Sequence, residues 1–203
     1  MSFELIDNLF QVLVLTGMSV ASFVLSFRRR SRACLILAFG YASFMMGTLY
    51  YLLHLVIRGY VPQIFYVAEC SWMAAYFFFL SLEILYWEHL RPRFSLPALL
   101  PSLITIGAVM KFQVFGPSPL MSGALAFTFG GLVYLCFSAL REEKHLCPYE
   151  LSLLCLIVLQ IALYVVSGYV HDYTRFNLYY VVDILLTMAM VSFLPHILRQ
   201  EEP

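Results

Sequence analysis

Carboxyl, imidazole and phenol groups stand at helical spacing inside otherwise apolar stretches of this sequence. The clearest case is a hairpin over residues 40–86, whose two arms are joined by a turn at 58–63. One helical face of the first arm carries Gly40, Ser43, Gly47, Tyr50 and His54. One face of the second arm carries Glu69, Trp72, Tyr76 and Glu83. Carboxylates and aromatic rings both attract cations, so these stripes predict one wall of a site for a small cationic or amphipathic molecule.

Two further polar residues, Gln160 and Asp183, fall inside apolar stretches nearer the C-terminus. A charge at the centre of a bilayer costs about 3 kcal/mol, so such residues need partners or a water-filled cavity. We expect Gln160 near mid-depth and Asp183 in the outer third. The sequence therefore predicts an outward-facing pocket with aromatic walls and two acids. The residues assigned to it are Glu69, Asp183, Trp72, Tyr76, Tyr164, Tyr50, His54, Gln160 and Tyr180.

A simpler interpretation of the same residues stays open. Tyr and Trp collect at membrane interfaces as belts, and the two acids could form ion pairs with Arg58 and Arg175. Glu83 is expected near the cytoplasmic surface, within reach of the arginines at 91 and 93. The small residues of the first arm favour a close helix contact, because they let two backbones approach each other in lipid.

The elements that would position these residues are seven apolar stretches, each near the length of about 20 residues that spans a bilayer. They cover approximately residues 6–27, 33–57, 65–87, 96–112, 120–140, 149–169 and 176–198. The chain is 62% hydrophobic and 12% charged, against about 25% charged in soluble domains. We therefore expect an all-α integral membrane protein, with residues 1–203 forming one domain.

Lys and Arg in the short connections predict the orientation of the chain. Nine of them follow the first, third, fifth and seventh stretches, whereas three follow the others. Seven crossings account for this alternation, with the N-terminus outside, the C-terminus in the cytoplasm and the protein in the cell membrane. The first stretch has an acidic flank before it and Arg28–Arg30 after it, so it is expected to be a spanning helix and not a cleavable signal peptide.

A weak internal repeat links the two halves of the sequence. Residues 58–61 and 167–170 both end in Gly-Tyr-Val, and each is followed by a helix that enters through Tyr-Val and soon reaches an acid. The repeat predicts a parallel 3+1+3 arrangement, in which the fourth helix is a linker. Coincidence among aromatic-rich segments explains the pattern equally well.

Several classes of function lack the residues that they need. Net charge is zero, which argues against nucleic-acid binding. The five histidines and five cysteines show no metal-ligand spacing, and no nucleophile has a base within helical reach. A retinal site would need a lysine deep in the last helix, whereas Lys111 and Lys144 lie in or beside loops. We expect no enzyme activity, catalytic residue, metal or cofactor.

The hairpin resembles a seven-helix membrane sensor region that begins many bacterial diguanylate cyclases and histidine kinases. The matching segments are Gly47-Thr48-Leu49-Tyr50-Tyr51, then residues 61–72, then Ala75-Tyr76, together with Asp183 near the start of the last helix. Thr48 and Glu69 stand where that region usually has Asp. The given sequence ends at Pro203 with no output domain, so we expect either a stand-alone sensor or the membrane part of a longer protein. The resemblance implies a sensor that signals through a separate cytoplasmic partner.

Three functions remain open at this point. The first is a sensor or receptor-like protein that binds a small ligand from outside and signals by helix movement. The second is a small-solute transporter of 3+1+3 architecture, for which Gln160 and Glu83 would matter. The third is a structural or assembly factor whose polar residues only hold helices together. The bilayer is the expected partner in all three.

Overall fold

The computed structural model describes residues 3–60, 62, 66–87, 94–112, 118–143, 147–170 and 172–200. These residues are almost entirely helical and contain no strand within those ranges. The helices are α1 (Phe3–Arg29), α2 (Arg32–Arg58), α3 (Tyr66–Trp87), α4 (Leu96–Phe112), α5 (Pro119–Glu143), α6 (Pro148–Ser167), α7 (Leu178–Val191) and α8 (Phe193–Gln200).

Six described helices are long and apolar enough to cross a membrane, which indicates a multi-pass membrane protein. They are α1, α2, α3, α5, α6 and the run from α7 through α8. The remaining apolar helix, α4, has 17 residues and contains Pro101. At 1.5 Å per residue it is about 25 Å long, slightly less than the hydrocarbon core of a bilayer.

Local signals in the sequence end or begin several helices. The α2 helix is capped by Ser31, whose side chain accepts a hydrogen bond from the Cys34 N–H, and by Gly59, where φ is 76°. The α7 helix is capped at its N-terminus by Asn177, whose side chain accepts from the Tyr179 N–H. The predicted single helix 176–198 is interrupted at Ser192, because Pro195 has no N–H to bond the carbonyl of the preceding turn.

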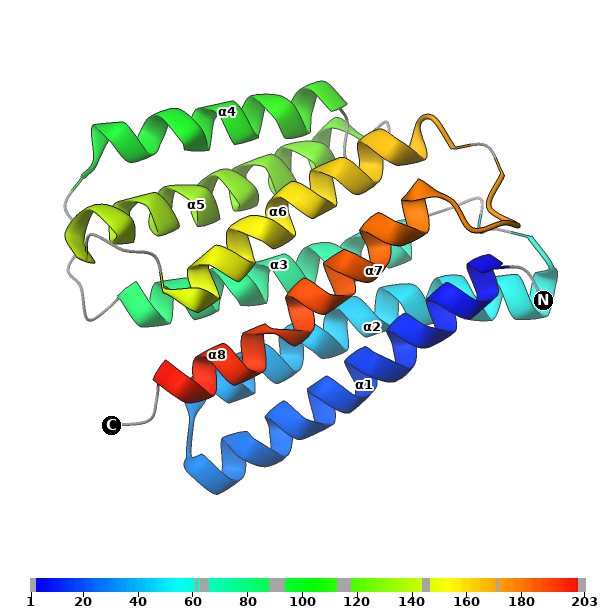
Figure 1. Ribbon diagram of the computed structural model, residues 1–203, viewed down its shortest axis with the longest axis horizontal. Helices are drawn as coiled ribbons and strands as arrows, with labels where there is room; N and C mark the ends of the chain where they lie inside the picture. The colour runs from blue at the N-terminus through cyan, green and yellow to red at the C-terminus, as the bar shows by residue number, and fades with distance from the viewer. Residues whose placement is uncertain are drawn as a thin grey trace.

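The helices pack side by side into one elongated bundle (Figure 1). The helices α1, α2 and α3 are consecutive neighbours, α3 packs against α5, and α5 pairs extensively with α4. The α6 and α7 helices pair with each other, and α7 also contacts α1. The α5 helix meets α6 only sparsely, so the packing order differs between the two halves of the chain, and the 3+1+3 repeat stays a prediction.

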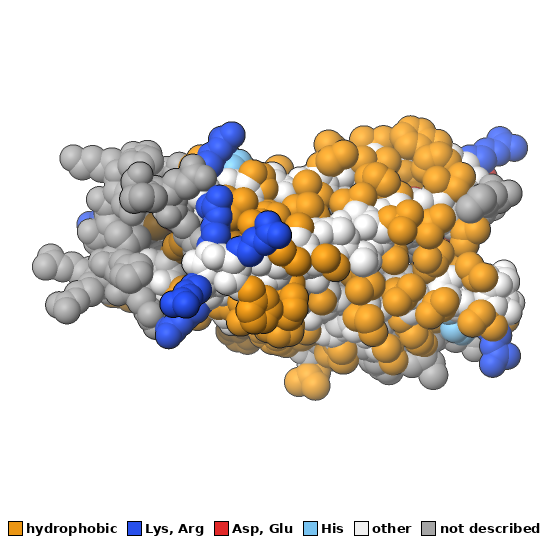
Figure 2. All heavy atoms as spheres, turned by 90° about the horizontal axis from the view of Figure 1, so that it is seen from below, with side chains coloured by type: hydrophobic (Ala, Val, Ile, Leu, Met, Phe, Trp, Pro, Cys, Tyr) orange, Lys and Arg blue, Asp and Glu red, His pale blue; other side chains and the backbone are white. Residues whose placement is uncertain are grey.

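Apolar side chains cover the outside of the bundle as well as its core. On α1, four exposed hydrophobic residues recur every seven positions: Ile6, Leu13, Val20 and Phe27. Figure 2 shows two groups of Lys and Arg side chains on one face, one left of the middle and one at the right end, with a mainly hydrophobic span between them. This outward apolar surface is suited to contact with lipid tails.

The predicted close contact between α2 and α3 is confirmed at two glycines. A Cβ atom added at Gly40 would lie 2.8 Å from Cε1 of Phe79. One added at Gly47 would lie 2.7 Å from Nε1 of Trp72 and 2.9 Å from the backbone oxygen of Ala68. The absence of a side chain at Gly47 therefore lets α3 approach and sets the position of the Trp72 indole.

We predict that Gly47→Ala lowers the free energy of unfolding by about 1–3 kcal/mol, because the added methyl group meets a backbone oxygen that cannot move alone. Gly17→Ala is the matched control, since a Cβ there has nothing within 4 Å. Thermal unfolding of the purified protein in detergent measures both. An unfolding temperature for Gly47→Ala equal to that of Gly17→Ala would contradict the close contact.

Candidate functional site

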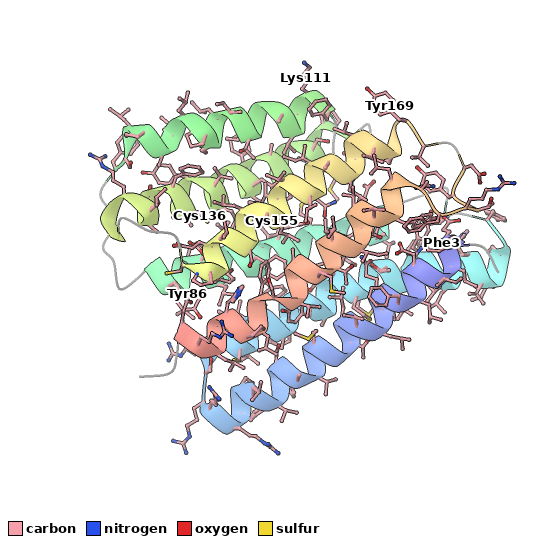
Figure 3. All side chains as sticks on the ribbon, viewed as in Figure 1. Phe3, Tyr86, Lys111, Cys136, Cys155 and Tyr169 are labelled. Carbon is pink, nitrogen blue, oxygen red and sulfur yellow. The ribbon has the colours of Figure 1, made fainter. Side chains whose placement is uncertain are left out.

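A cavity of about 610 Å³ opens among the helices at the end of the bundle that contains the N-terminus. Its volume lies within the range of small-molecule sites in proteins. Glu69 on α3 and Asp183 on α7 both line it, as do side chains from α1, α2 and α6. Phe3, Lys111 and Tyr169 mark this end of the molecule in Figure 3, and Tyr86 marks the other end. We call this hollow the acidic cavity.

The wall of the acidic cavity combines carboxyl groups with aromatic rings. Glu4 joins Glu69 and Asp183 as a third acid, and no Lys or Arg is among the described lining residues. The aromatic lining residues are Phe44, Tyr51, Trp72, Phe112, Tyr164, Tyr173, Tyr179 and Tyr180. Such a wall attracts a cation through charge and through the faces of the rings, and it also accepts an apolar ligand body.

A set of polar contacts between helices centres on Gln11 of α1, which lines the cavity and is 5% exposed. Its Nε2 atom donates to Oδ1 of Asp183 over 3.2 Å and to Oγ1 of Thr187 over 3.0 Å. Its Oε1 atom accepts from the Thr48 hydroxyl over 2.6 Å. One amide therefore joins α1, α2 and α7, and both of its ends are satisfied inside an apolar bundle.

Two neighbouring groups extend this network. The Trp72 indole N–H donates to Oγ1 of Thr48 over 3.4 Å, which adds α3 to the same set of contacts. The carboxyl group of Asp7, which is 5% exposed, lies within hydrogen-bonding reach of Asp183. A hydrogen bond between two carboxyl groups requires a proton on one of them, because two carboxylates offer only acceptors.

Gln160 lines the cavity from α6 and is held by a residue outside it. The Tyr76 hydroxyl donates a short hydrogen bond to Oε1 of Gln160. Tyr76 itself is fully buried and is not among the lining residues; its ring packs edge-on against Phe79 and Phe129. The predicted pocket residue Tyr76 is thus placed in the core, where it positions the Gln160 side chain.

Tyr50 and His54 are the other predicted pocket residues that do not line the acidic cavity. Nδ1 of His54 lies 2.9 Å from the carbonyl oxygen of Tyr60, at the C-terminal end of α2. These two residues continue the glycine stripe, which faces α3. The α2 face that meets the cavity contains Phe44 and Tyr51, with Thr48 between them in the same helical row.

The structure brings the other six predicted residues together. Glu69, Asp183, Trp72, Tyr164, Gln160 and Tyr180 all line the acidic cavity. Neither Glu69 nor Asp183 forms an ion pair with Arg58 or Arg175, and all four residues lie in the described ranges. The structure therefore does not contain the ion pairs of the simpler interpretation. Glu69 and Asp183 are both partly exposed, toward the hollow that they line.

Sequence reasoning missed the contribution of α1. Glu4, Asn8 and Gln11 line the cavity, and Asp7 contacts the lining residue Asp183. The spacing 4, 7, 8 and 11 is that of one helical face, so the signal is present in the sequence. It is easily overlooked, because polar residues near the start of a chain are common outside the membrane as well.

Contacts between the chain end and the α6–α7 connection build the mouth of the cavity. The Tyr51 hydroxyl donates to Oε1 of Glu4 over 2.8 Å, and the Phe3 N–H donates to the Thr174 carbonyl over 3.3 Å. The side-chain and backbone hydrogen bonds from Thr174 lower the pKa of the exposed Asp172 carboxyl below its ordinary value. Its carboxylate therefore adds negative charge at this end.

Glu83 lies outside the acidic cavity, 14 residues beyond Glu69 and so about 21 Å further along α3. It is 1% exposed and accepts a weak bond from Sγ of Cys136 over 3.9 Å. Its Oε2 atom has no hydrogen-bond partner among the described residues. Glu83 is thus enclosed by the bundle, and its depth near the cytoplasmic surface stays a prediction. The arginines at 91 and 93, its predicted partners, lie outside the described residues.

Within the described ranges, no group of three or more His, Cys, Asp or Glu side chains could hold a metal ion. Comparisons with known proteins add no further constraint on the site. No protein-family model matches the chain, no curated protein matches it, and no solved structure matches it.

We predict that Gln11→Leu lowers the free energy of unfolding by about 1–3 kcal/mol, because it removes the short bond from the Thr48 hydroxyl and the bonds to Asp183 and Thr187. Asn8→Leu is the matched control on the same helix and the same cavity, since Nδ2 of Asn8 bonds the Glu4 carbonyl of its own helix and no other described residue. Thermal unfolding in detergent compares the two. If Gln11→Leu proves at least as stable as Asn8→Leu, Gln11 does not hold the helices together.

Proposed function

We propose that this chain is a multi-pass membrane sensor or receptor-like protein that binds a small cationic or amphipathic molecule in the acidic cavity. The observation that carries the proposal is one hollow of about 610 Å³ lined by Glu4, Glu69 and Asp183 and by aromatic rings. A protonated amine attached to an aromatic or aliphatic group can pair with these acids and pack against the aromatic rings.

The orientation that suits this function has the acidic cavity facing outward. The nine-to-three bias of Lys and Arg between the two sets of connections supports it, and seven crossings, with α4 as one of them, give that alternation. A ligand would then enter from outside without crossing the bilayer, and the opposite end of the helices would face a cytoplasmic signalling partner.

Binding would change helix packing through the Gln11 contacts. A ligand ammonium group beside Asp183 competes with Nε2 of Gln11 for the same carboxyl oxygen, which Gln11 approaches to 3.2 Å. Gln11 also bonds Thr48 on α2 and Thr187 on α7. A loss of the Asp183 contact would therefore weaken the α1–α7 contact, with Thr187 as the remaining partner on α7, while the bond to α2 stays. A ligand shifts the equilibrium between two arrangements of the helices only to the extent that it binds one arrangement more tightly than the other.

Transport is the alternative, and the buried carboxyl group of Glu83 favours it. That group lies on the same helix as Glu69, and a transported molecule would meet it as a second binding group nearer the other side of the membrane. Against it, Glu83 is not among the residues that line the acidic cavity. Counterflow of a labelled ligand in proteoliposomes separates the two functions, because a sensor binds the ligand without exchanging it across the bilayer.

We predict that small amines stabilise the purified protein in a thermal-shift screen of amines, indoles and lipids. Tryptamine and indole-3-acetate form a pair with one ring system and opposite charge, and the cation is expected to give the larger shift. At a ligand concentration of 100 times Kd, the stabilisation is about 2.7 kcal/mol. Glu69→Gln and Asp183→Asn should each reduce it, because each removes one carboxylate from the wall.

Glu83→Gln serves as the control for that screen, since it removes an acid from the same helix outside the cavity. It is expected to keep the shift produced by the amine. If no compound in the screen stabilises the parent protein more than it stabilises Glu69→Gln and Asp183→Asn, the proposed ligand-binding function is wrong.

A further inference from the structure

Two carboxyl groups meet between α1 and α7, which lie side by side at the wall of the acidic cavity (Figure 1). Asp7 of α1 is 5% exposed and lies within hydrogen-bonding reach of Asp183, which lines the cavity from α7. We call Asp7 and Asp183 the carboxyl pair. Ionised carboxyl groups offer only acceptors, so a hydrogen bond between the two needs one proton. The contact therefore implies an exchangeable proton directly beside the proposed ligand.

The bonds around the carboxyl pair indicate which group holds this proton. Nε2 of Gln11 donates to Oδ1 of Asp183 over 3.2 Å, and such a bond is stronger when the acceptor is a carboxylate. Asp183 is also partly exposed to the cavity, where solvent can stabilise its charge, whereas Asp7 is buried. These contacts favour a carboxylate at Asp183 and a protonated carboxyl group at Asp7.

The other titratable groups around the carboxyl pair are acids and phenols. Those that line the same cavity are Glu4, Tyr51, Glu69, Tyr164, Tyr173, Tyr179 and Tyr180, and Tyr76 lies beside them in the core. The cations Arg58, Lys111 and Arg175 lie toward this end of the chain's helices but are exposed, and they do not line the cavity. His54 does not line it either, and His171 lies outside the described residues. A ligand cation is therefore a main source of positive charge beside the pair.

We propose that the acidic cavity exchanges a cation for a proton, so that a ligand ammonium group bound at Asp183 releases the proton of the carboxyl pair. The inference rests on the function proposed above and names the ion that regulates the same site. An ammonium group and a proton have the same charge, so each weakens the binding of the other to the pair. The O–H bond of Asp7 breaks and its proton passes to solvent, while the ligand keeps its own protons and stays beside two carboxylates.

The exchange gives ligand binding a defined dependence on pH. Acid adds protons to the carboxyl pair and so weakens its attraction for a cation, and a rise in pH removes the competing proton and strengthens that attraction. Where one full proton is released for each cation bound, Kd falls by about tenfold per pH unit. In the orientation proposed above, the pH outside the membrane would set the sensitivity of the protein to its ligand.

The test counts the protons that are released when tryptamine binds to the purified full chain. Isothermal titration calorimetry in two buffers of different ionisation enthalpy gives this number directly. Titrations from about pH 6 to about pH 8 also give the change of Kd, since a primary alkylamine, like lysine, keeps its charge below about pH 10. For the parent chain we expect net proton release and a Kd that falls as the pH rises.

Asp7→Asn removes the exchangeable proton, while its amide can still donate a hydrogen bond to Asp183. Tryptamine should bind to this variant with much smaller proton release and a flatter dependence on pH. Asp7→Ser, which also lacks a titratable proton, takes its place if Asp7→Asn does not fold. Glu83→Gln is the matched control, because Glu83 is another buried acid of the bundle but does not line the cavity. It should keep the proton release of the parent.

Infrared spectroscopy of the ligand-free protein tests the shared proton by itself. The parent should contain the C=O band of a protonated carboxyl group that is missing from Asp7→Asn, and tryptamine should weaken that band. Binding of tryptamine without proton release, or with equal release from Asp7→Asn, would overturn the exchange and leave the proposed function standing. Equal infrared spectra of the parent and Asp7→Asn in the carboxyl region would overturn it too. A failure of every amine to bind would instead overturn the proposed function, and the exchange with it.

Discussion

The arrangement at the N-terminal end of this bundle depends on the need of buried polar groups for hydrogen-bond partners inside an apolar environment. In water a glutamine can bond to solvent, but in a membrane-embedded bundle it must find partners on other helices. Gln11 bonds Asp183 and Thr187 on α7 and Thr48 on α2. The position of α1 against α7, and with it the hollow between α1, α3, α6 and α7, follows from these bonds.

The same need for hydrogen-bond partners explains why some tyrosines line the acidic cavity and others lie in the core. The Tyr76 hydroxyl is satisfied by Gln160, and the Tyr41 hydroxyl donates to the Met190 carbonyl over 2.6 Å, so both rings can be fully buried. Tyr164 and Tyr179 remain partly exposed and line the acidic cavity. The two ends of the bundle thus differ in chemistry: one holds acids and aromatic rings around a hollow, and the other holds arginines.

Much of the helical arrangement could be predicted from hydrophobic length, because a helix that contacts lipid must be apolar over most of its surface. The meeting of Glu69 and Asp183 on one hollow could also be predicted, since both are acids early in their apolar segments. The roles of Tyr50 and His54 could not, because one residue along a helix rotates a side chain by about 100°. Their row faces α3, and the row through Phe44 and Thr48 faces the cavity. The interruption at Ser192 could have been predicted from Pro195, but the pairing of α4 with α5 depends on packing that hydrophobic patterns do not record.

The central claim is that Glu69 and Asp183 face one water-filled, negatively charged hollow that is open to the outside. Cysteine labelling in intact cells tests it most directly, with two impermeant methanethiosulfonate reagents, one bearing trimethylammonium and the other sulfonate. Above the signal of the parent chain, Glu69→Cys and Asp183→Cys should react from outside, and faster with the cationic reagent. Leu186→Cys, a fully buried position three residues along α7 from Asp183, should not react. Failure of both acid positions to react from either side of the membrane, or faster reaction with the anionic reagent, would contradict the account.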